Sequence, residues 1–347
     1  MAPPTFPAPL ARTAARSGHL QRALPGRDIT PSGTAYERTC GQFVATASEG
    51  AAPHCFIPLP GGRDVTRPAA ASRKVLVAWD GSLAAATALP VAKLVARQLG
   101  AQVEALYVAS DAQDREERGS LLLREAKRLG FGLRLATGDA ANEIVRWTEE
   151  PGIVLVALTT HGRDLEVAYR LGGVAGRIVA RTTRPVLIVK PESANTVRGL
   201  KRLLVPVDGT PKTAAALHPV MELAAALGAA IDLLYVAAPD QKAPEERGSV
   251  TAPRYVDQPQ HEWPEWAAEV VHRLATCCAG CPEEVPVRIF LAQGEVGDEI
   301  ARFAMDNQED AIVLVRRSRF QPERAKVIRS VLRQTSCLMI IVGGEET

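Results

Sequence analysis

The stretch KVLVAWDGSLAAATALPVAKLVARQLGAQVEALYVA, residues 74–109, occurs a second time as RLLVPVDGTPKTAAALHPVMELAAALGAAIDLLYVA, residues 202–237. The offset is a constant 128 residues, for example from Asp80 to Asp208 and from Tyr107 to Tyr235. Self-similarity at a fixed spacing indicates two copies of one structural unit.

The likeness resumes further along each copy. GDAANEIVRWTEE from Gly138 corresponds to GEVGDEIARFAMD from Gly294, now 156 residues apart. The second copy therefore carries an insertion of 28 residues, which we place around SVTAPRYVDQPQHEWPEW. The last apolar runs also correspond, RPVLIV from Arg184 with SCLMIIV from Ser336.

Each copy alternates two kinds of apolar stretch. A continuous β-branched run such as VLVA is typical of a strand covered on both faces, and the Ala/Leu stretch after it has helical spacing and ends near Gly100. This alternation predicts an α/β fold of two tandem, doubly wound parallel sheets, which bind ligands at the carboxyl ends of strands where the strand order reverses. In the first copy we predict strands over 74–79, 103–109, 132–136, 153–158 and 185–189, and helices over 82–99, 112–129, 140–149 and 171–182.

The first 72 residues differ from the rest. They hold 10 of the 25 prolines, contain arginine but no lysine, and lack a helical or strand period, which predicts a mostly disordered leader. The arginine-rich, acid-poor start also resembles an organellar transit peptide, and composition leaves that alternative open. We accordingly set the domains at 1–72, 73–193 and 198–347.

Charge and composition argue against several classes of protein. The 41 basic and 39 acidic residues nearly balance, so no strong field favours nucleic acid or an anionic membrane. The longest apolar runs, such as IVLVAL at 153–158, fall far short of the roughly 20 residues that span a bilayer. Six cysteines are too few and too unevenly placed for a disulfide framework. We expect a cytoplasmic protein with neither nucleic-acid nor membrane partners.

Three stretches of the first copy converge on the predicted ligand-binding edge. Asp80 ends the first strand in AWDGS, Val108 ends the second in LYVA, and LTTHGRDLEVAYRLGGVAGR leaves the fourth strand and enters the last helix. Together these residues resemble the universal stress protein family in its tandem form. The resemblance implies adenine-nucleotide α-hydrolase-like domains that pack as an intramolecular pseudo-dimer through their last strands and flanking helices, and a role in stress tolerance.

ATP-binding members of that family follow the fourth strand with Gly, two residues, Gly, nine residues, Gly, and then Ser or Thr. Here Gly162 and Gly172 keep the spacing, but Thr159 stands at the first glycine and Gly173 at the hydroxyl position. Glycines let backbone N–H groups approach phosphate oxygens, and a helix N-terminus adds about half a positive charge. Loss of one hydroxyl hydrogen bond costs roughly 1 kcal/mol, so we interpret the loop as a weakened phosphate cradle.

The resemblance implies that adenosine lies against Asp80 and Val108, with ATP, with or without Mg²⁺, as the ligand. Asp80 has an alternative role as N-cap of the helix that begins near residue 82. Trp79 points away from Asp80 by the period of two, which predicts a core or interface position. The complete cofactor-binding set that we assign is Ala78, Asp80, Val108, Leu158, Thr159, Gly162, Gly172, Gly173 and Val174.

The second copy keeps Asp208 and Val236 at the adenosine-side positions. Its fourth strand, however, is followed by RRSRFQPERAKVIRSVLRQ, which contains no glycine, so we predict that this half does not bind ATP in the family manner. The basic run from Arg316 to Arg333 is either a solvated helix face or a surface that pairs with phosphates or an acidic partner. CCAGC at 277–281 lacks the further ligands of a structural zinc site and reads as a surface loop.

The sequence lacks GxSxG, GxxxxGK[ST] and HExxH, so we assign no catalytic residue and no metal site. The leading hypothesis is a binding module whose first domain takes an adenine nucleotide as a regulatory ligand. The alternatives are a nucleotide-free interaction protein, whose basic run and tryptophan-containing insertion contact a protein partner, and a slow ATPase. Assembly into a homo-oligomer is left open.

Overall fold

The computed structural model describes part of the chain, within a compact unit of residues 33–347. Most of the predicted leader lies outside the described residues, as do Gly162, Gly172, CCAGC and the insertion. The described residues are 35–39, 42–46, 73–160, 173–194, 197–210, 213, 217–237, 285–316 and 322–343.

The first copy forms a parallel sheet whose strands alternate with helices, as predicted. The observed ends lie within one or two residues of the expected ones wherever both are described. Its elements are β3 (Lys74–Ala78), α1 (Leu83–Ala86), α2 (Ala88–Gln98), β4 (Gln102–Ala109), α3 (Ala112–Leu129), β5 (Gly132–Thr137), α4 (Ala140–Thr148), β6 (Ile153–Thr159), α5 (Gly173–Arg181) and β7 (Val186–Val189).

The helix expected over 82–99 is divided at Thr87 into α1 and α2. Pro90 has no N–H with which to donate to the carbonyl four residues earlier, so the helical ladder cannot continue through this point. The Thr87 hydroxyl instead donates to the Ala84 carbonyl at 2.6 Å and closes the end of α1. The prediction of one continuous helix over 82–99 was therefore wrong at this turn.

The second copy repeats the arrangement. Its elements are β8 (Arg202–Val207), α7 (Leu217–Leu227), β9 (Ala230–Ala237), β10 (Val287–Gln293), α9 (Val296–Asp306), β11 (Ala311–Arg316), α10 (Pro322–Gln334) and β12 (Leu338–Gly343).

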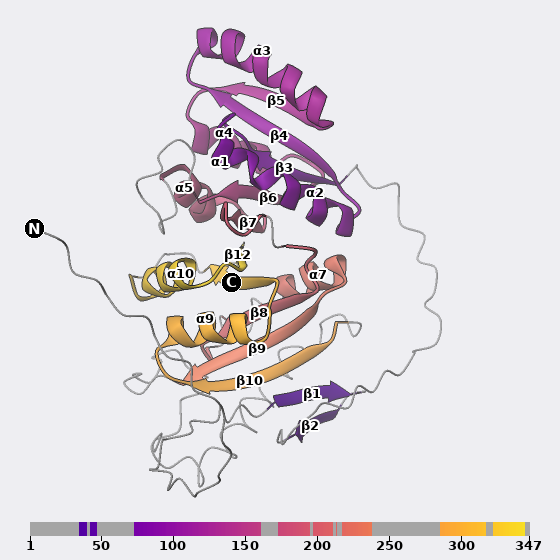
Figure 1. The fold of residues 1–347 in the computed structure, drawn as a ribbon, viewed down its shortest axis with the longest axis vertical. Helices are drawn as coiled ribbons and strands as arrows, with labels where there is room; N and C mark the ends of the chain where they lie inside the picture. Colours follow the sequence, from indigo (N-terminus) through magenta and orange to yellow (C-terminus); the bar gives the residue numbers. More distant parts are fainter. Residues whose placement is uncertain are drawn as a thin grey trace, which may run out of the picture. The chain divides into compact units, whose positions relative to one another are not determined.

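Strand order is the same in both copies. The first copy runs β7-β6-β3-β4-β5 and the second runs β12-β11-β8-β9-β10 (Figure 1). The order thus reverses between β3 and β6 in one copy and between β8 and β11 in the other. The predicted doubly wound fold is confirmed, and these two reversals are where such sheets place their ligands.

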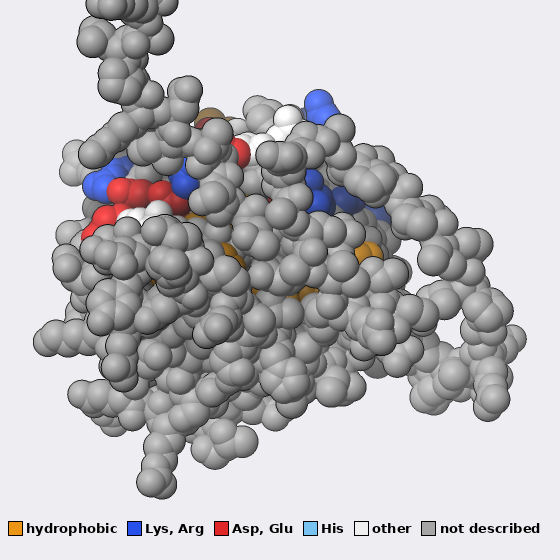
Figure 2. All heavy atoms as spheres, turned by 90° about the horizontal axis from the view of Figure 1, so that it is seen from below, with side chains coloured by type: hydrophobic (Ala, Val, Ile, Leu, Met, Phe, Trp, Pro, Cys, Tyr) orange, Lys and Arg blue, Asp and Glu red, His pale blue; other side chains and the backbone are white. Residues whose placement is uncertain are grey.

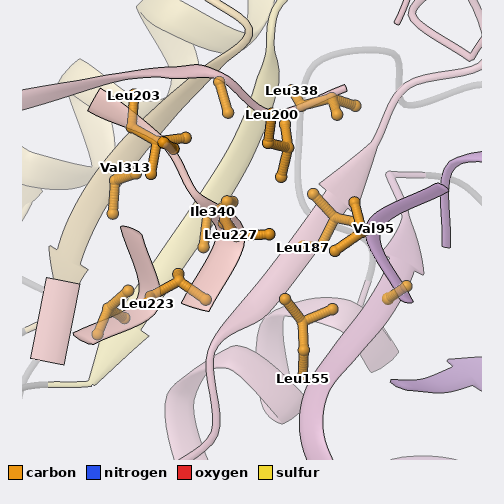
Figure 3. Close-up of a cluster of buried hydrophobic side chains, with 14 of the residues drawn as sticks. Val95, Leu155, Leu187, Leu200, Leu203, Leu223, Leu227, Val313, Leu338 and Ile340 are labelled. Carbon is orange, nitrogen blue, oxygen red and sulfur yellow. The ribbon is translucent and has the colours of Figure 1, made fainter. Parts of the chain in front are cut away.

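The two sheets join through their last strands. β7 pairs with β12 antiparallel, with Ile188 opposite Met339 and Val186 opposite Ile341. The same pairing places apolar side chains of both copies in one cluster, in which Leu155 and Leu187 of the first copy lie near Ile340 of the second (Figure 3). The predicted pseudo-dimer through the last strands is confirmed, and burial of this shared apolar surface is its main source of stability.

Helices cover both faces of the joined sheet. One face packs buried residues of α2, α3 and α7 against the sheet, and the other packs those of α4, α5, α9 and α10. Because successive strand residues point to opposite faces, Val77 and Trp79 belong to the first layer and Leu76 to the second. Trp79 is buried and packs edge-on against Phe131 with ring centroids 5.4 Å apart, in the core position predicted for it.

Two short strands precede the repeats, within the region that the sequence assigned to the leader. β1 (Ala35–Thr39) and β2 (Gln42–Thr46) pair antiparallel with each other. β1 also pairs antiparallel with β10, with Tyr36 opposite Ile289. This hairpin extends the second sheet at the β10 edge, a pairing that the sequence interpretation did not include.

Charges on the described surface are mixed. On the face shown in Figure 2, acidic side chains lie next to basic ones, in agreement with the near balance of the two in the whole chain. Among the residues that the structure describes, the helices are too short or too polar to cross a membrane.

Candidate functional site

Three of the predicted site residues form an apolar strip at the carboxyl ends of the strands. Val77 pairs with Ala157, so Ala78 and Leu158 follow side by side where β3 meets β6. Val108 lies on the neighbouring β4, two residues past the partner of Ala78, and on the same face of the sheet. Leu158 is buried, whereas Ala78 and Val108 are half-buried at the rim of the core. The strip therefore lies at the reversal of strand order.

Asp80 follows β3 at the same edge. Its Oδ1 accepts a hydrogen bond from the Ser82 N–H at 2.9 Å. The N-cap of α1 is Ser82 itself, whose hydroxyl accepts from the Ala85 N–H at 3.0 Å. The alternative role of Asp80 as a helix N-cap is therefore wrong. Asp80 is half-buried and closes the turn beside the apolar strip.

Gly81 makes that turn possible. Its φ of +76° lies in the left-handed region that side chains disfavour. A Cβ built on it would lie 2.7 Å from Cδ2 of Leu122, a buried residue of α3. Both the backbone angle and the close approach of α3 therefore require glycine between Asp80 and Ser82.

The phosphate side of the predicted site is described in part. Thr159 ends β6, is largely buried, and pairs with Val189. Residues 161–172 lie outside the described residues, and α5 begins after them with Gly173 and Val174, which are both exposed. Among the residues that the structure describes, a Cβ at Gly173 would meet no atom within 4 Å. The structure thus brings together Ala78, Val108, Leu158 and Asp80 around the β3–β6 reversal, and it leaves the placement of Gly162 and Gly172 as a prediction.

Polar contacts attach α5 to α4. Arg177 donates to Asp139, the N-cap of α4, and Arg181 donates to Asn142. The Arg177 hydrogen bond is the largest cause that lowers the pKa of Asp139 to about 2. These contacts lie along the side of α5, whose first turn contains no acidic residue and begins with the exposed Gly173 and Val174.

At the equivalent edge of the second copy, Asp208 accepts hydrogen bonds from neighbouring residues of its own copy. Asp208 Oδ1 accepts hydrogen bonds from the hydroxyls of Thr210 at 2.7 Å and Thr213 at 2.6 Å. Both threonines are buried. Burial, and next the nearby Asp208 carboxylate, raise the pKa of Tyr235 to about 12. Asp208 therefore serves a local hydrogen-bond cluster.

Arg316, the first residue of the basic run, crosses to the other copy. Its guanidinium donates to the carbonyls of Ala180 at 2.6 Å and Thr182 at 2.9 Å, at the C-terminus of α5. Neither alternative for the basic run included this role. The sequence signal that could have indicated this contact is the difference between the copies at this position, which is Arg316 in the second and Thr160 in the first.

Lys190 makes the reciprocal contact. It follows β7, is buried, and donates to the carbonyl of Leu332 at 2.9 Å and to that of Thr335, at the C-terminus of α10. Burial lowers the pKa of its ammonium group. Each copy therefore supplies a cation that satisfies the terminal carbonyls of a helix in the other.

The fold consists of two tandem doubly wound α/β domains that join edge to edge, with a candidate site where the first sheet reverses its strand order. It therefore belongs to the class of duplicated, doubly wound α/β proteins. The model of the universal stress protein family matches residues 71–190 and 199–343, more than half of the chain. The chain therefore belongs to the universal stress protein family, as its sequence indicated.

Individual relatives agree with this assignment. A universal stress protein of Methanocaldococcus jannaschii is 27% identical over an alignment of 139 residues that covers 82% of that protein and 34% of this chain. A universal stress protein structure from Archaeoglobus fulgidus, 15% identical, covers 79% of this chain and 97% of its own, with a TM-score of 0.53. A functionally unknown protein from Pseudomonas aeruginosa, 14% identical, covers 79% and 93%, with a TM-score of 0.51. The two structures share the tandem fold with this chain.

Proposed function

We propose that the first domain binds an adenine nucleotide, ATP with or without Mg²⁺, as a regulatory ligand of a stress-response protein. The observation that carries this proposal is the juxtaposition of the apolar strip, Ala78, Val108 and Leu158, with the Asp80 carboxylate at the β3–β6 reversal. An apolar surface suits the faces of a purine, and a carboxylate accepts hydrogen bonds from ribose hydroxyls.

The start of α5 supports the phosphate half of the proposal. The first N–H groups of a helix have no partner inside it and carry partial positive charge. The first turn of α5 contains no acidic residue to compete for them, and no atom of the described residues would lie within 4 Å of a Cβ at Gly173. Phosphates that extend from the strip toward α5 would meet these donors.

The second domain serves as a structural and regulatory partner in this proposal. Its Asp208 is engaged by two threonine hydroxyls, and Arg316 is engaged by carbonyls of the first domain. We therefore expect one nucleotide per chain. We also retain a binding role without dedicated catalysis, and a cytoplasmic location, as parts of the proposal.

The nucleotide-free interaction protein remains the second candidate. It is favoured by Thr159 and Gly173, which stand where ATP-binding members resembling this chain carry glycine and a hydroxyl residue. A slow ATPase would bind at the same site and would differ by releasing phosphate.

The test is calorimetric titration of Mg-ATP into the full chain and two variants. We expect one equivalent to bind to the wild type, most of the heat to disappear in Asp80→Ala, and the stoichiometry to persist in Asp208→Asn, which serves as the matched control. Phosphate release measured on the same samples tests the ATPase alternative. Absence of binding at millimolar Mg-ATP, in protein purified free of nucleotide, would favour the interaction protein.

A further inference from the structure

Helix α5 is held at one end by the second domain. At its C-terminus, the Arg316 guanidinium bonds the carbonyls of Ala180 and Thr182, which belong to the last turn and the residue after it. At its N-terminus it begins with Gly173, next to the phosphate half of the proposed nucleotide site. One short helix thus links the domain interface to the candidate site.

We propose that Arg316 is a positioning residue for the nucleotide site of the opposite domain: by fixing the C-terminus of α5, it sets the N-terminal turn that faces the phosphates. This inference rests on the proposed function for the identity of the ligand. It adds a regulatory route, because any change at Arg316 in the second domain would reach the site in the first.

The physical argument starts from the length of α5. It has nine residues, and helices this short are marginal without tertiary support. The last carbonyls of a helix have no partner within it, and a cation placed there supplies hydrogen bonds and interacts favourably with the helix dipole. A planar guanidinium can donate to two carbonyls at once, as Arg316 does, whereas an ammonium is a single point charge.

The surroundings of Arg316 are shaped for this contact. It pairs in the sheet with Gly343, and a Cβ at Gly343 would lie 3.1 Å from the Arg316 Nη2 atom. The equivalent pair in the first copy is Thr160 and Lys190, so the arginine and its glycine occur together in one copy. The second copy has lost the glycine loop after its fourth strand and has an anchor for the first copy at the same place.

The experiment compares Arg316→Gln with the wild-type full chain in two measurements. Mg-ATP titration should show a dissociation constant raised about three- to tenfold with unchanged stoichiometry, the range expected from a terminal cation on a helix. Hydrogen–deuterium exchange of the nucleotide-free protein should show faster exchange in α5. Arg316→Lys should give a dissociation constant and an exchange rate between those of the wild type and Arg316→Gln. The lysine keeps the positive charge but lacks the planar guanidinium that donates to two carbonyls at once.

Arg333→Gln is the matched control. It removes the same charge from an exposed position on α10 in the same domain and should leave both measurements unchanged. Gly343→Ala is the second variant, in case Arg316→Gln does not fold, because its added Cβ would lie 3.1 Å from the Arg316 Nη2 atom and requires the guanidinium to shift by a few tenths of an ångström without removing it. We expect the same direction of change from it, and wild-type behaviour in both Arg316→Gln and Gly343→Ala would overturn the proposal.

The two readouts separate this inference from the proposed function. If the wild type binds no nucleotide, the proposed function fails, and the exchange of α5 still decides whether Arg316 anchors the helix. If α5 exchanges faster in Arg316→Gln while Mg-ATP affinity is unchanged, nucleotide binding stands and the positioning role is overturned.

Discussion

Asp80 and Asp208 occupy equivalent positions in the two repeats, and each carboxylate accepts the backbone N–H two residues later, from Ser82 and Thr210 respectively. Asp208 also accepts the buried hydroxyls of Thr210 and Thr213. The same aspartate thus closes a turn in both domains and organises a hydroxyl cluster in the second. Divergence of the two copies is visible at a single matched position.

Asp208→Ala should destabilise the protein more than Asp80→Ala does. The substitution removes the carboxylate that accepts from the buried hydroxyls of Thr210 and Thr213, which costs about 1–3 kcal/mol. Urea denaturation of both variants measures the difference. Spectrophotometric titration should also show a lower pKa for Tyr235, because one of the two causes that raise it is removed. Equal stability of the two variants would contradict the assigned role of the cluster.

Gly173→Ser should tighten nucleotide binding. A Cβ at this position meets no atom of the described residues within 4 Å, and the serine adds a hydroxyl at the start of α5. One additional hydrogen bond to phosphate is worth roughly 1 kcal/mol, or about a fivefold lower dissociation constant for Mg-ATP. Titration against Gly173→Ala separates the effect of the hydroxyl from that of the added carbon. A serine variant no tighter than the alanine variant would place the phosphates elsewhere.

Gly81→Ala should cost more stability than Gly130→Ala. Both glycines have positive φ, +76° and +73°, so alanine is strained at each by roughly 1 kcal/mol. At Gly81 the new Cβ would also approach Leu122 Cδ2 to 2.7 Å, whereas at Gly130 it would meet no atom of the described part of the chain within 4 Å. Thermal unfolding of the pair isolates the packing cost. Equal losses would mean that α3 shifts to accommodate the methyl group.

Glu309 is a buried acid at the opposite, amino-terminal edge of the second sheet. It is 5% exposed, and neither carboxylate oxygen has a hydrogen-bond partner among the described residues. Burial, and then the neighbouring carboxylate of Asp232, raise the pKa of Glu309 to about 8, while the charges of Arg202 and Arg288 oppose the shift. Ile153 stands at the equivalent position of the first copy, where no charge is buried.

This raised pKa predicts that stability falls as the pH rises. The folded state holds the Glu309 proton more tightly than the unfolded state, so its contribution is complete below the unfolded pKa of 4.5 and is lost as the pH passes through about 8. Glu309→Gln should remove this dependence and stabilise the protein at pH 8 by on the order of 3 kcal/mol. The midpoints of urea denaturation of the wild type and Glu309→Gln, measured from pH 5 to pH 9, test this pH dependence. A variant with the same pH slope as the wild type would show that Glu309 is ionised in the folded protein.

Much of the first domain could be predicted from local patterns. The strands from 74 to 189 and the helices between them follow apolar periodicity, and the observed ends agree closely. The break at Thr87 was missed because a proline one turn later acts through the helical ladder rather than through the apolar pattern. The hairpin of β1 and β2 was missed because its strands lie in a segment without the period of two and because β1 pairs with β10, far along the chain.

The sequence by itself determined the duplication, the α/β class and the candidate residues at the strand ends, because an internal repeat and the periods of strand and helix are properties of neighbouring residues. The tertiary structure decided which of those residues have other partners. Arg316 bonds Ala180 and Lys190 bonds Leu332, pairs that are 136 and 142 positions apart. No local pattern specifies such contacts, since they exist only once β7 and β12 pair and bring the helix ends of one domain to the cations of the other.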